Sequence, residues 1–191
     1  IYAPAQFTTI DVVAPVVTNI APANGAVDVT ANTTLRLWFN EVVGIGSGTV
    51  VIREVATDIV VEVLAVNAGN TVLTTTSGKT TAEITRGVVL SSKKQYYVEV
   101  ASGTFKDLAN NPMAAISGIV NWSFTTKDTV LPLLVKTVPD HAAATTPLII
   151  KGSTLSIEFN EAMKAPTSGV VYVRYVSTGN VFEVINANAL T

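Results

Sequence analysis

The sequence predicts an all-β protein built from two antiparallel sheets packed face to face, and three observations carry this prediction. Apolar and polar residues alternate in several short segments, as they do in half-buried strands. These segments are rich in β-branched and aromatic residues, and Gly, Asn, Asp or Pro lies between them. No stretch of a dozen residues keeps the apolar spacing of a helix. Short strands at this spacing are typical of β-sandwiches.

Four strands and two turns are predicted most directly. The alternation is clear over residues 34–39, 49–54, 96–101 and 121–125. Residues 56–58 (Ala-Thr-Asp) lie between two apolar runs, as a hairpin connection would. Residues 77–79 (Ser-Gly-Lys) form the second predicted turn, because Ser and Gly are common turn residues.

Composition excludes several classes of partner. The chain has 12 Lys and Arg against 14 Asp and Glu, without basic runs, so nucleic acid is not an expected partner. Apolar residues make up 48% of the chain and charged residues 14%, a balance that excludes disorder. The apolar stretch 59–66 contains Glu62 and is far shorter than the roughly 20 residues that span a bilayer, so membrane insertion is not expected. The chain has no cysteine, which excludes disulfides and thiolate metal sites.

An internal repeat organises the chain. Phe124-Thr125-Thr126 repeats Phe7-Thr8-Thr9, and the linkers that follow share a Thr-x-Asp-x-Val-x-Pro pattern. Further matches run from residues 35–41 to 155–161 and from 47–63 to 168–184. The small change of spacing between these blocks is what a short loop insertion would produce.

The repeat predicts the domain boundaries. Residues 1–13 are expected to be the last strand of a preceding repeat plus a linker, and 14–126 a complete domain. Residues 127–130 are a second linker, and 131–191 the first half of a second, truncated domain. Such a half domain would leave its apolar face uncovered. We expect a second molecule or the first domain to cover it, with residues 1–9 of a neighbour as a candidate for a missing strand.

The two copies also assign the faces of one strand. Leu35, Leu37 and Phe39 keep apolar counterparts in the second copy, so they are expected to face the core. Trp38 is replaced by Glu158 in the second copy, so its ring is expected to face outward.

Alternation alone predicts which way the side chains of three other aromatic residues face. Trp122 alternates with polar neighbours and is expected to pack inward beside Phe124. Tyr96 and Tyr97 must point to opposite faces of their strand, so at most one of them is buried.

Five motifs follow one another in a recognisable order. They are Pro22-Ala23-Asn24-Gly25-Ala26, Phe39-Asn40-Glu41, Tyr96-Tyr97-Val98, residues 103–107 with 110–112, and residues 122–126. In this order and spacing they resemble the bacterial Ig-like domains repeated in surface-layer and large secreted, adhesin-type proteins. The second copy, with Phe159-Asn160-Glu161-Ala162-Met163, is closer still to that pattern.

The resemblance implies an immunoglobulin-like antiparallel β-sandwich in tandem repeats. It also implies a secreted or cell-surface protein in which the repeats are a non-catalytic structural or adhesive module, a spacer or stalk. Neighbouring Ig-like repeats are then the expected partners. The alternative left open is a module that binds a carbohydrate or another surface ligand, such as a cell-surface polysaccharide or protein.

Calcium is the one cofactor that the residues suggest, because it prefers hard oxygen ligands. The candidate ligands are Asn40, Glu41, Asp107 and Asn110. The alternative is that these side chains hydrogen-bond the backbone of turns at strand ends. Asp11 and Asp128, one in each linker, could likewise bind an ion at a joint between repeats, or belong to simple proline-containing turns.

For other ligands the sequence offers little. Trp38, together with whichever of Tyr96 and Tyr97 is exposed, is the candidate for stacking on a sugar. The Gly44, Gly46 and Gly48 run precedes a strand, so it predicts a hairpin or bulge loop instead of a phosphate-binding loop at a helix start.

No catalytic residue is predicted. His141 is the only histidine, and it falls in a turn, so a Ser-His-Asp triad is not supported. Glu62 and Glu183 recur at mid-strand positions of separate copies, so they are expected to be solvent-facing charges and not a glycosidase pair.

Overall fold

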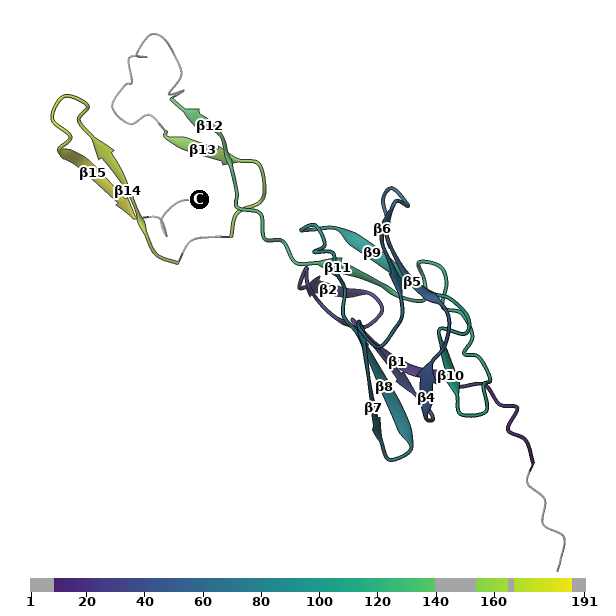
Figure 1. The fold of residues 1–191 in the computed structure, drawn as a ribbon. Helices are drawn as coiled ribbons and strands as arrows, with labels where there is room; N and C mark the ends of the chain where they lie inside the picture. The colour runs from purple at the N-terminus through teal and green to yellow at the C-terminus, as the bar shows by residue number, and fades with distance from the viewer. Residues whose placement is uncertain (1–8, 140–153, 165–166, 187–191) are drawn as a thin grey trace, which may run out of the picture. The chain divides into compact units, whose positions relative to one another are not determined.

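The computed structural model describes residues 9–139, 154–164 and 167–186, and the chain divides into two compact units between Thr129 and Val130. All regular secondary structure in the described residues is β-strand, so the prediction of an all-β fold is confirmed (Figure 1). Residues 1–8, which include most of the strand expected from a preceding repeat, lie outside the described residues.

The first unit contains a four-stranded antiparallel sheet. Its strands, in spatial order, are β1 (Val17–Ala21), β3 (Leu35–Phe39), β8 (Lys79–Ile84) and β7 (Thr71–Thr76). Strands β7 and β8 are joined at Ser77 and Gly78, whose positive φ angles of 52° and 74° suit the right-handed twist of a tight hairpin. The second predicted turn is therefore confirmed.

A five-stranded sheet forms the other layer of the first unit. Its strands, in spatial order, are β2 (Ala26–Val29), β11 (Ser123–Thr126), β9 (Gln95–Val100), β5 (Thr49–Glu54) and β6 (Val60–Ala65). The first predicted turn joins β5 to β6. Neighbours are antiparallel except β2 and β11, which are parallel. A short antiparallel pair, β4 (Val43–Ile45) with β10 (Phe105–Asp107), completes the unit.

The core of the first unit lies between these two sheets. Leu35, Leu37 and Phe39 are at most 1% exposed, whereas Trp38 is only partly buried, which confirms the assigned faces. Trp122 is fully buried, and its indole Nε1 donates a hydrogen bond of 2.8 Å to the carbonyl oxygen of Pro22. Burial of a Trp is usual only when its N–H has such a partner.

The other aromatic assignments also hold. Phe124 is fully buried, and its ring centroid lies 6.2 Å from that of Tyr96. Tyr96 is 2% exposed, while Tyr97 is partly exposed on the outer face of the same strand.

Glu62 was expected to be a solvent-facing charge, and this expectation is wrong. Glu62 lies opposite Ile52, so its side chain is on the core side of edge strand β6, and it is 7% exposed. Its Oε1 accepts hydrogen bonds from the backbone N–H groups of Gly87 at 2.6 Å and Val88 at 3.1 Å. A carboxylate tolerates such burial only when charges and hydrogen bonds compensate it.

Arg86 supplies the compensating charge. Its guanidinium lies 3.8 Å from Oε2 of Glu62, and the two side chains are 2% and 6% exposed. The guanidinium also donates to the carbonyl oxygens of Thr33 at 2.7 Å and Ala31 at 2.9 Å. Burial lowers the pKa of Arg86, and the negative charge of Glu62 opposes that shift. The pair therefore joins β6, the β2–β3 loop and the β8–β9 loop.

The chain enters and leaves the first unit at opposite ends of the sandwich (Figure 1). Before β1, Val16 exchanges hydrogen bonds with Asn40, at the C-terminal end of β3. After β11, the N–H of Lys127 donates to the carbonyl oxygen of Val29, close to the loop that precedes β3. Since β3 runs from one end of the sheet to the other, these two anchor points are separated by the length of that strand.

The described part of the second unit consists of two antiparallel pairs. They are β12 (Leu134–Val138) with β13 (Ser156–Phe159), and β14 (Val170–Arg174) with β15 (Val181–Asn186). The register of each pair, including its irregularity, is the register of β1–β3 and of β5–β6 at the repeat positions. Leu133 and Asn160 likewise exchange the same hydrogen bonds as Val16 and Asn40.

Candidate functional site

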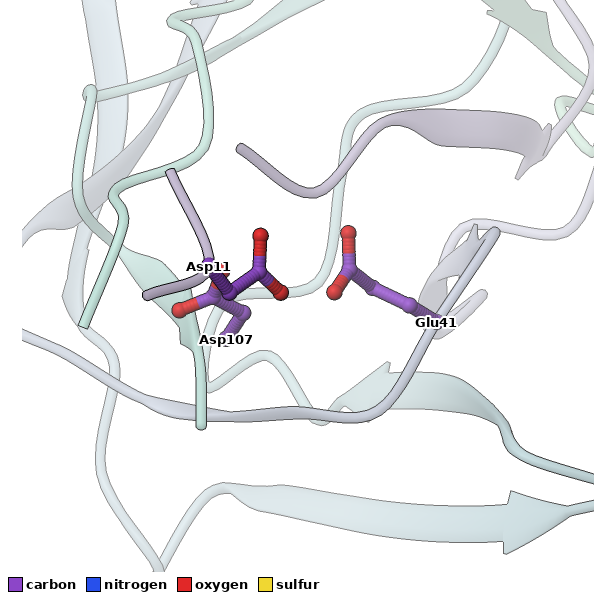
Figure 2. Close-up of side chains that lie close together, drawn as sticks. All are labelled: Asp11, Glu41 and Asp107. Atoms are coloured by element: carbon purple, nitrogen blue, oxygen red, sulfur yellow. The ribbon is translucent and has the colours of Figure 1, made fainter. Parts of the chain in front are cut away.

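Three carboxylates from distant parts of the sequence meet at one end of the first unit. Asp11 comes from the segment before β1, Glu41 from the loop after β3, and Asp107 from the end of β10. One carboxylate oxygen of each lies within 4.8 Å of the other two, and Figure 2 shows the three side chains gathered together, with the carboxylates of Asp11 and Glu41 facing each other. We call these three residues the carboxylate cluster.

Asp107 is held rigidly within the carboxylate cluster. Its Oδ1 accepts hydrogen bonds from the backbone N–H groups of Ala109 at 2.9 Å and Asn111 at 2.7 Å, and its Oδ2 accepts one from Nδ2 of Asn111 at 2.7 Å. Burial works to raise the pKa of Asp107, but the hydrogen bonds from Asn111 and from the turn backbone outweigh it and lower that pKa. Asp107 therefore carries a negative charge at neutral pH.

Glu41 is perturbed in the opposite direction. Partial burial raises the pKa of its carboxyl group, and the negative charges of Asp107 and Asp11 raise it further. Three like charges at this separation repel one another unless a proton or a cation joins them.

Asn111 ties the incoming chain to the carboxylate cluster. Besides Asp107, its Nδ2 contacts the carbonyl oxygens of Asp11 at 3.1 Å and Val13 at 3.3 Å. The sequence predicts that Asn111 lies in the loop after Asp107. Its contact with a residue 100 positions away has no signal in the local pattern.

The other two candidate calcium ligands, Asn40 and Asn110, make hydrogen bonds with the backbone. Asn40 uses its Oδ1 to accept a hydrogen bond of 2.7 Å from the N–H of Val16. Asn110 has a positive φ of 73° and closes the turn by donating its N–H to the carbonyl oxygen of Asp107. The role of Asn40 matches the alternative of a side chain that hydrogen-bonds backbone at a strand end, whereas the bond of Asn110 is made by its main chain.

Asp128, the repeat counterpart of Asp11, lies at the other end of the first unit. Its Oδ2 is 2.7 Å from Nζ of Lys93, and the hydroxyl of Ser92 lies 3.4 Å from its Oδ1. The same hydroxyl accepts a hydrogen bond of 2.8 Å from the N–H of Thr129. The departing linker is thus attached to the β8–β9 loop.

The carboxylate cluster offers hard oxygen atoms of the kind that calcium takes as ligands. Two of the four candidate ligands, Glu41 and Asp107, belong to it, and Asp11 joins them from the linker. Acidic groups on a surface also gather without a metal, so calcium binding stays a prediction of the sequence.

Glu41→Gln is expected to stabilise the first unit at neutral pH by about 0.5 kcal/mol, the scale of exposed charge interactions. Because the pKa of Glu41 is raised in the folded protein, the folded state binds this proton more tightly than the unfolded chain does. The stability from this proton is present below the ordinary pKa of 4.5 and is lost as the pH rises through the raised value. Thermal unfolding of both proteins from acidic to neutral pH measures the difference.

The wild type and Glu41→Gln also test whether the carboxylate cluster binds calcium. A calcium-dependent rise in the unfolding midpoint of the wild type that Glu41→Gln abolishes would establish a cation site, since a ligand specific for the folded state stabilises it. Equal midpoints for the two proteins at every pH, without calcium, would contradict the repulsion at the carboxylate cluster.

The candidates for stacking on a sugar, Trp38 and the exposed Tyr97, lie on different sheets of the first unit. Trp38 lies on the outer face of the four-stranded sheet, opposite Thr81 of β8 and on the same face as the Arg36–Glu83 ion pair of 2.8 Å. Tyr97 lies on the outer face of the five-stranded sheet, where its hydroxyl donates to Asp58. The two rings are on opposite sides of the sandwich, so they cannot stack on one sugar.

The glycine run forms a close contact between two loops. The N–H groups of Gly46 and Ser47 donate to the carbonyl oxygens of Thr104 and Gly103 at 2.9 and 3.0 Å. A side chain at Gly46 would collide with the carbonyl of Gly103. Gly44 lies within β4, so the run is not the hairpin or bulge loop that was expected. Gly46 and Gly48 pack closely against Gly103 and Thr104, and no helix follows in the described residues. His141 lies outside the described residues.

A family model described as bacterial Ig-like domain matches residues 11–126, which spans the first unit from Asp11 of the carboxylate cluster to the end of β11. No curated protein matches the chain. Among the described residues, no helix is long and apolar enough to cross a membrane.

Proposed function

The chain belongs to the bacterial Ig-like domain family, and from this membership we propose that it is a non-catalytic structural or adhesive module of a bacterial cell-surface or secreted protein. Its role is that of a spacer or stalk, in which successive Ig-like repeats hold other parts of the protein at a distance. The proposed partners are neighbouring repeats. Members of one fold family differ in function, so the proposal depends on the arrangement of the chain ends as well as on membership.

The arrangement of the two chain ends of the first unit carries this proposal. The incoming segment is attached at one end by Asn111, and the departing segment at the other end by Ser92 and Lys93. Units with opposite, attached ends extend an array when they are joined, whereas units with adjacent ends would fold back on one another. Pro15 and Pro132, which follow the two linkers, restrict the backbone further.

The test is to lengthen the chain by one unit. Inserting a second copy of residues 14–130 after Val130 is expected to increase the maximum dimension by about 35 Å, the diameter of a compact domain of this size. Small-angle X-ray scattering measures this dimension. An increase much smaller than one domain diameter would mean that the copies pack side by side, and the spacer role would be wrong.

A matched control separates stiffness from length. Replacing residues 127–130 with a Gly/Ser segment of equal length keeps the number of units but removes the attachments of Asp128 and Thr129. Because Gly/Ser segments behave as flexible coils, this control is expected to give a broader distribution of distances than the native linker. Equal distributions would mean that the attachments do not orient the next unit.

A further inference from the structure

Among the described residues, bulges interrupt three of the four outer edges of the two main sheets in the first unit. The edge strands are β1 and β7 in one sheet and β2 and β6 in the other. Strands β1, β2 and β6 each contain one residue more than the strand with which they pair, and in β1 and β6 the extra residues are Thr18 and Val61. In β1 a side chain also covers a backbone group, because Oδ1 of Asn19 accepts a hydrogen bond from the N–H of Ile20. Bulges and covered backbone groups keep an edge from pairing with another strand.

Strand β7 is the fourth edge, and it is regular. It pairs with β8 along its whole length without an irregularity, and no described strand pairs with its other side (Figure 1). It contains neither a charged residue nor a Pro, and all of its residues except Leu73 are β-branched. An uncharged, regular edge strand of this composition is ready to pair with another strand.

Three residues of β7 direct their backbone groups to this open side. The N–H of Thr80 donates to the carbonyl oxygen of Glu41 at 3.0 Å, so it points away from its neighbour Thr75 in β7. Next to the other end of β7, the N–H of Thr85 donates to the carbonyl oxygen of Asn70 at 2.8 Å. Bonded and non-bonded pairs alternate in an antiparallel ladder, and both observations give the same alternation. The residues whose N–H and C=O groups face the open edge are therefore Thr71, Leu73 and Thr75.

The order of residues along this edge is the same in both directions, because a Thr lies two positions before Leu73 and another lies two positions after it. We propose that β7 pairs with β7 of a second molecule of this protein, antiparallel and centred on Leu73. Leu73 then lies opposite Leu73 of the second molecule, and Thr71 lies opposite its Thr75. Each residue with open backbone groups meets another such residue, and each of these pairs exchanges two backbone hydrogen bonds.

The charges and side chains along β7 favour a second molecule as the partner. In a symmetric interface a charged residue near the axis meets its own kind, which is unfavourable. Strand β7 has no charge, and Glu83, which lies opposite Val72 in β8, is paired with Arg36 at 2.8 Å. On the outer face, the 63% exposed side chain of Val72 lies opposite Thr74 of the second molecule. Pairs of β-branched side chains at such positions stabilise a sheet.

This pairing aligns the first units of the two molecules in opposite directions. Strands β7 and β3 are both antiparallel to β8, so they run the same way along the first unit. Strand β3 leads from the end where the chain leaves the unit to the end where it enters. Two molecules joined at β7 therefore lie side by side with their chain directions opposed. This lateral contact goes beyond the spacer role and does not depend on it.

Hydrogen exchange measured for each residue by NMR tests the pairing on the full chain. Raising the protein concentration is expected to slow exchange at Thr71, Leu73 and Thr75, whose amides are open in the single molecule. The amides of Val72 and Thr74 already bond β8, so their exchange should change much less. A chain that stays monomeric up to about 1 mM in sedimentation velocity would overturn the proposal. So would slower exchange confined to the second unit, because the contact would then lie elsewhere.

Two exposed valines on edge strands give a matched pair of variants. Val72→Lys places like charges close to the proposed axis and is expected to weaken association about 10-fold, since symmetry repeats each unfavourable pair. Val63→Lys, at a 58% exposed position of edge strand β6, is the control and should leave association unchanged. Adding Thr74→Glu to Val72→Lys is expected to restore association, because the two new, opposite charges face each other across the interface. Equal effects of the two lysine replacements, or no recovery in the double variant, would contradict the pairing.

Discussion

Arg86→Met is expected to destabilise the first unit by about 3–5 kcal/mol, the cost of removing one partner from a buried ion pair. The replacement fills a similar volume but leaves the carboxylate of Glu62 buried without a counter-charge. It also leaves the carbonyl oxygens of Ala31 and Thr33 without their donor. Since domains are stable by only about 5–15 kcal/mol, this loss is large enough to unfold a marginal unit.

Urea unfolding followed by tryptophan fluorescence measures this effect on the full chain. Both tryptophans, Trp38 and Trp122, lie in the first unit, so the signal reports on that unit alone. The matched control is Arg36→Met. It breaks the Arg36–Glu83 pair, whose side chains are 46% and 39% exposed, and should cost no more than about 1 kcal/mol. Equal losses of unfolding free energy for the two variants would mean that breaking the buried Arg86–Glu62 pair costs no more than breaking an exposed ion pair.

The double variant Glu62→Leu with Arg86→Met distinguishes charge from packing. If the uncompensated carboxylate causes most of the loss, removing it should make the double variant more stable than Arg86→Met alone. A double variant that loses the sum of the two single effects would assign the loss to the orphaned carbonyl oxygens and to packing.

Trp122→Ala is expected to destabilise the first unit by about 3–5 kcal/mol, because a large, fully buried side chain is replaced by a cavity. Trp122→Phe keeps most of the ring volume but leaves the carbonyl oxygen of Pro22 without its 2.8 Å hydrogen bond, so a loss of about 1–3 kcal/mol is expected. Urea unfolding followed by the fluorescence of Trp38 measures both.

Trp38→Ala is the control for this pair, with Trp122 as the remaining reporter. Its ring lies on the outer face of β3 and is only partly buried, so the loss should be clearly smaller than that of Trp122→Ala. A loss as large as that of Trp122→Ala would contradict the assignment of Trp122 to the core and Trp38 to the surface.

Much of the fold could be predicted because alternation and repetition are local signals. Strand β5 was expected at its observed bounds, and β3, β9 and β11 within two residues of theirs. The second copy resolved the faces of β3, since it replaced Trp38 and kept the apolar character of Leu35. The parallel pairing of β2 with β11 had no such signal, because it joins segments that are distant in sequence.

The candidate site was less predictable, because its contacts are long-range. Glu41 and Asp107 were both candidate ligands, but the sequence did not indicate that Asp11 would join them. Glu62 was misassigned because a charged residue within an apolar run of an edge strand is usually solvated. The compensating Arg86 lies in a different loop, and its role depends on tertiary structure.

The parallel β2–β11 pairing determines how the first unit would respond to a pulling force. Tension would enter before β1 at one end of the sandwich and leave after β11 at the other. Strands β2 and β11 run in the same direction and are bonded, for example from Gly25 N to Ser123 O at 2.7 Å and from Lys127 N to Val29 O at 2.8 Å. Force on β11 from its C-terminal end and on β2 from its N-terminal side would slide the two strands along each other. Their hydrogen bonds would then break together and not in succession, which is the geometry that resists extension.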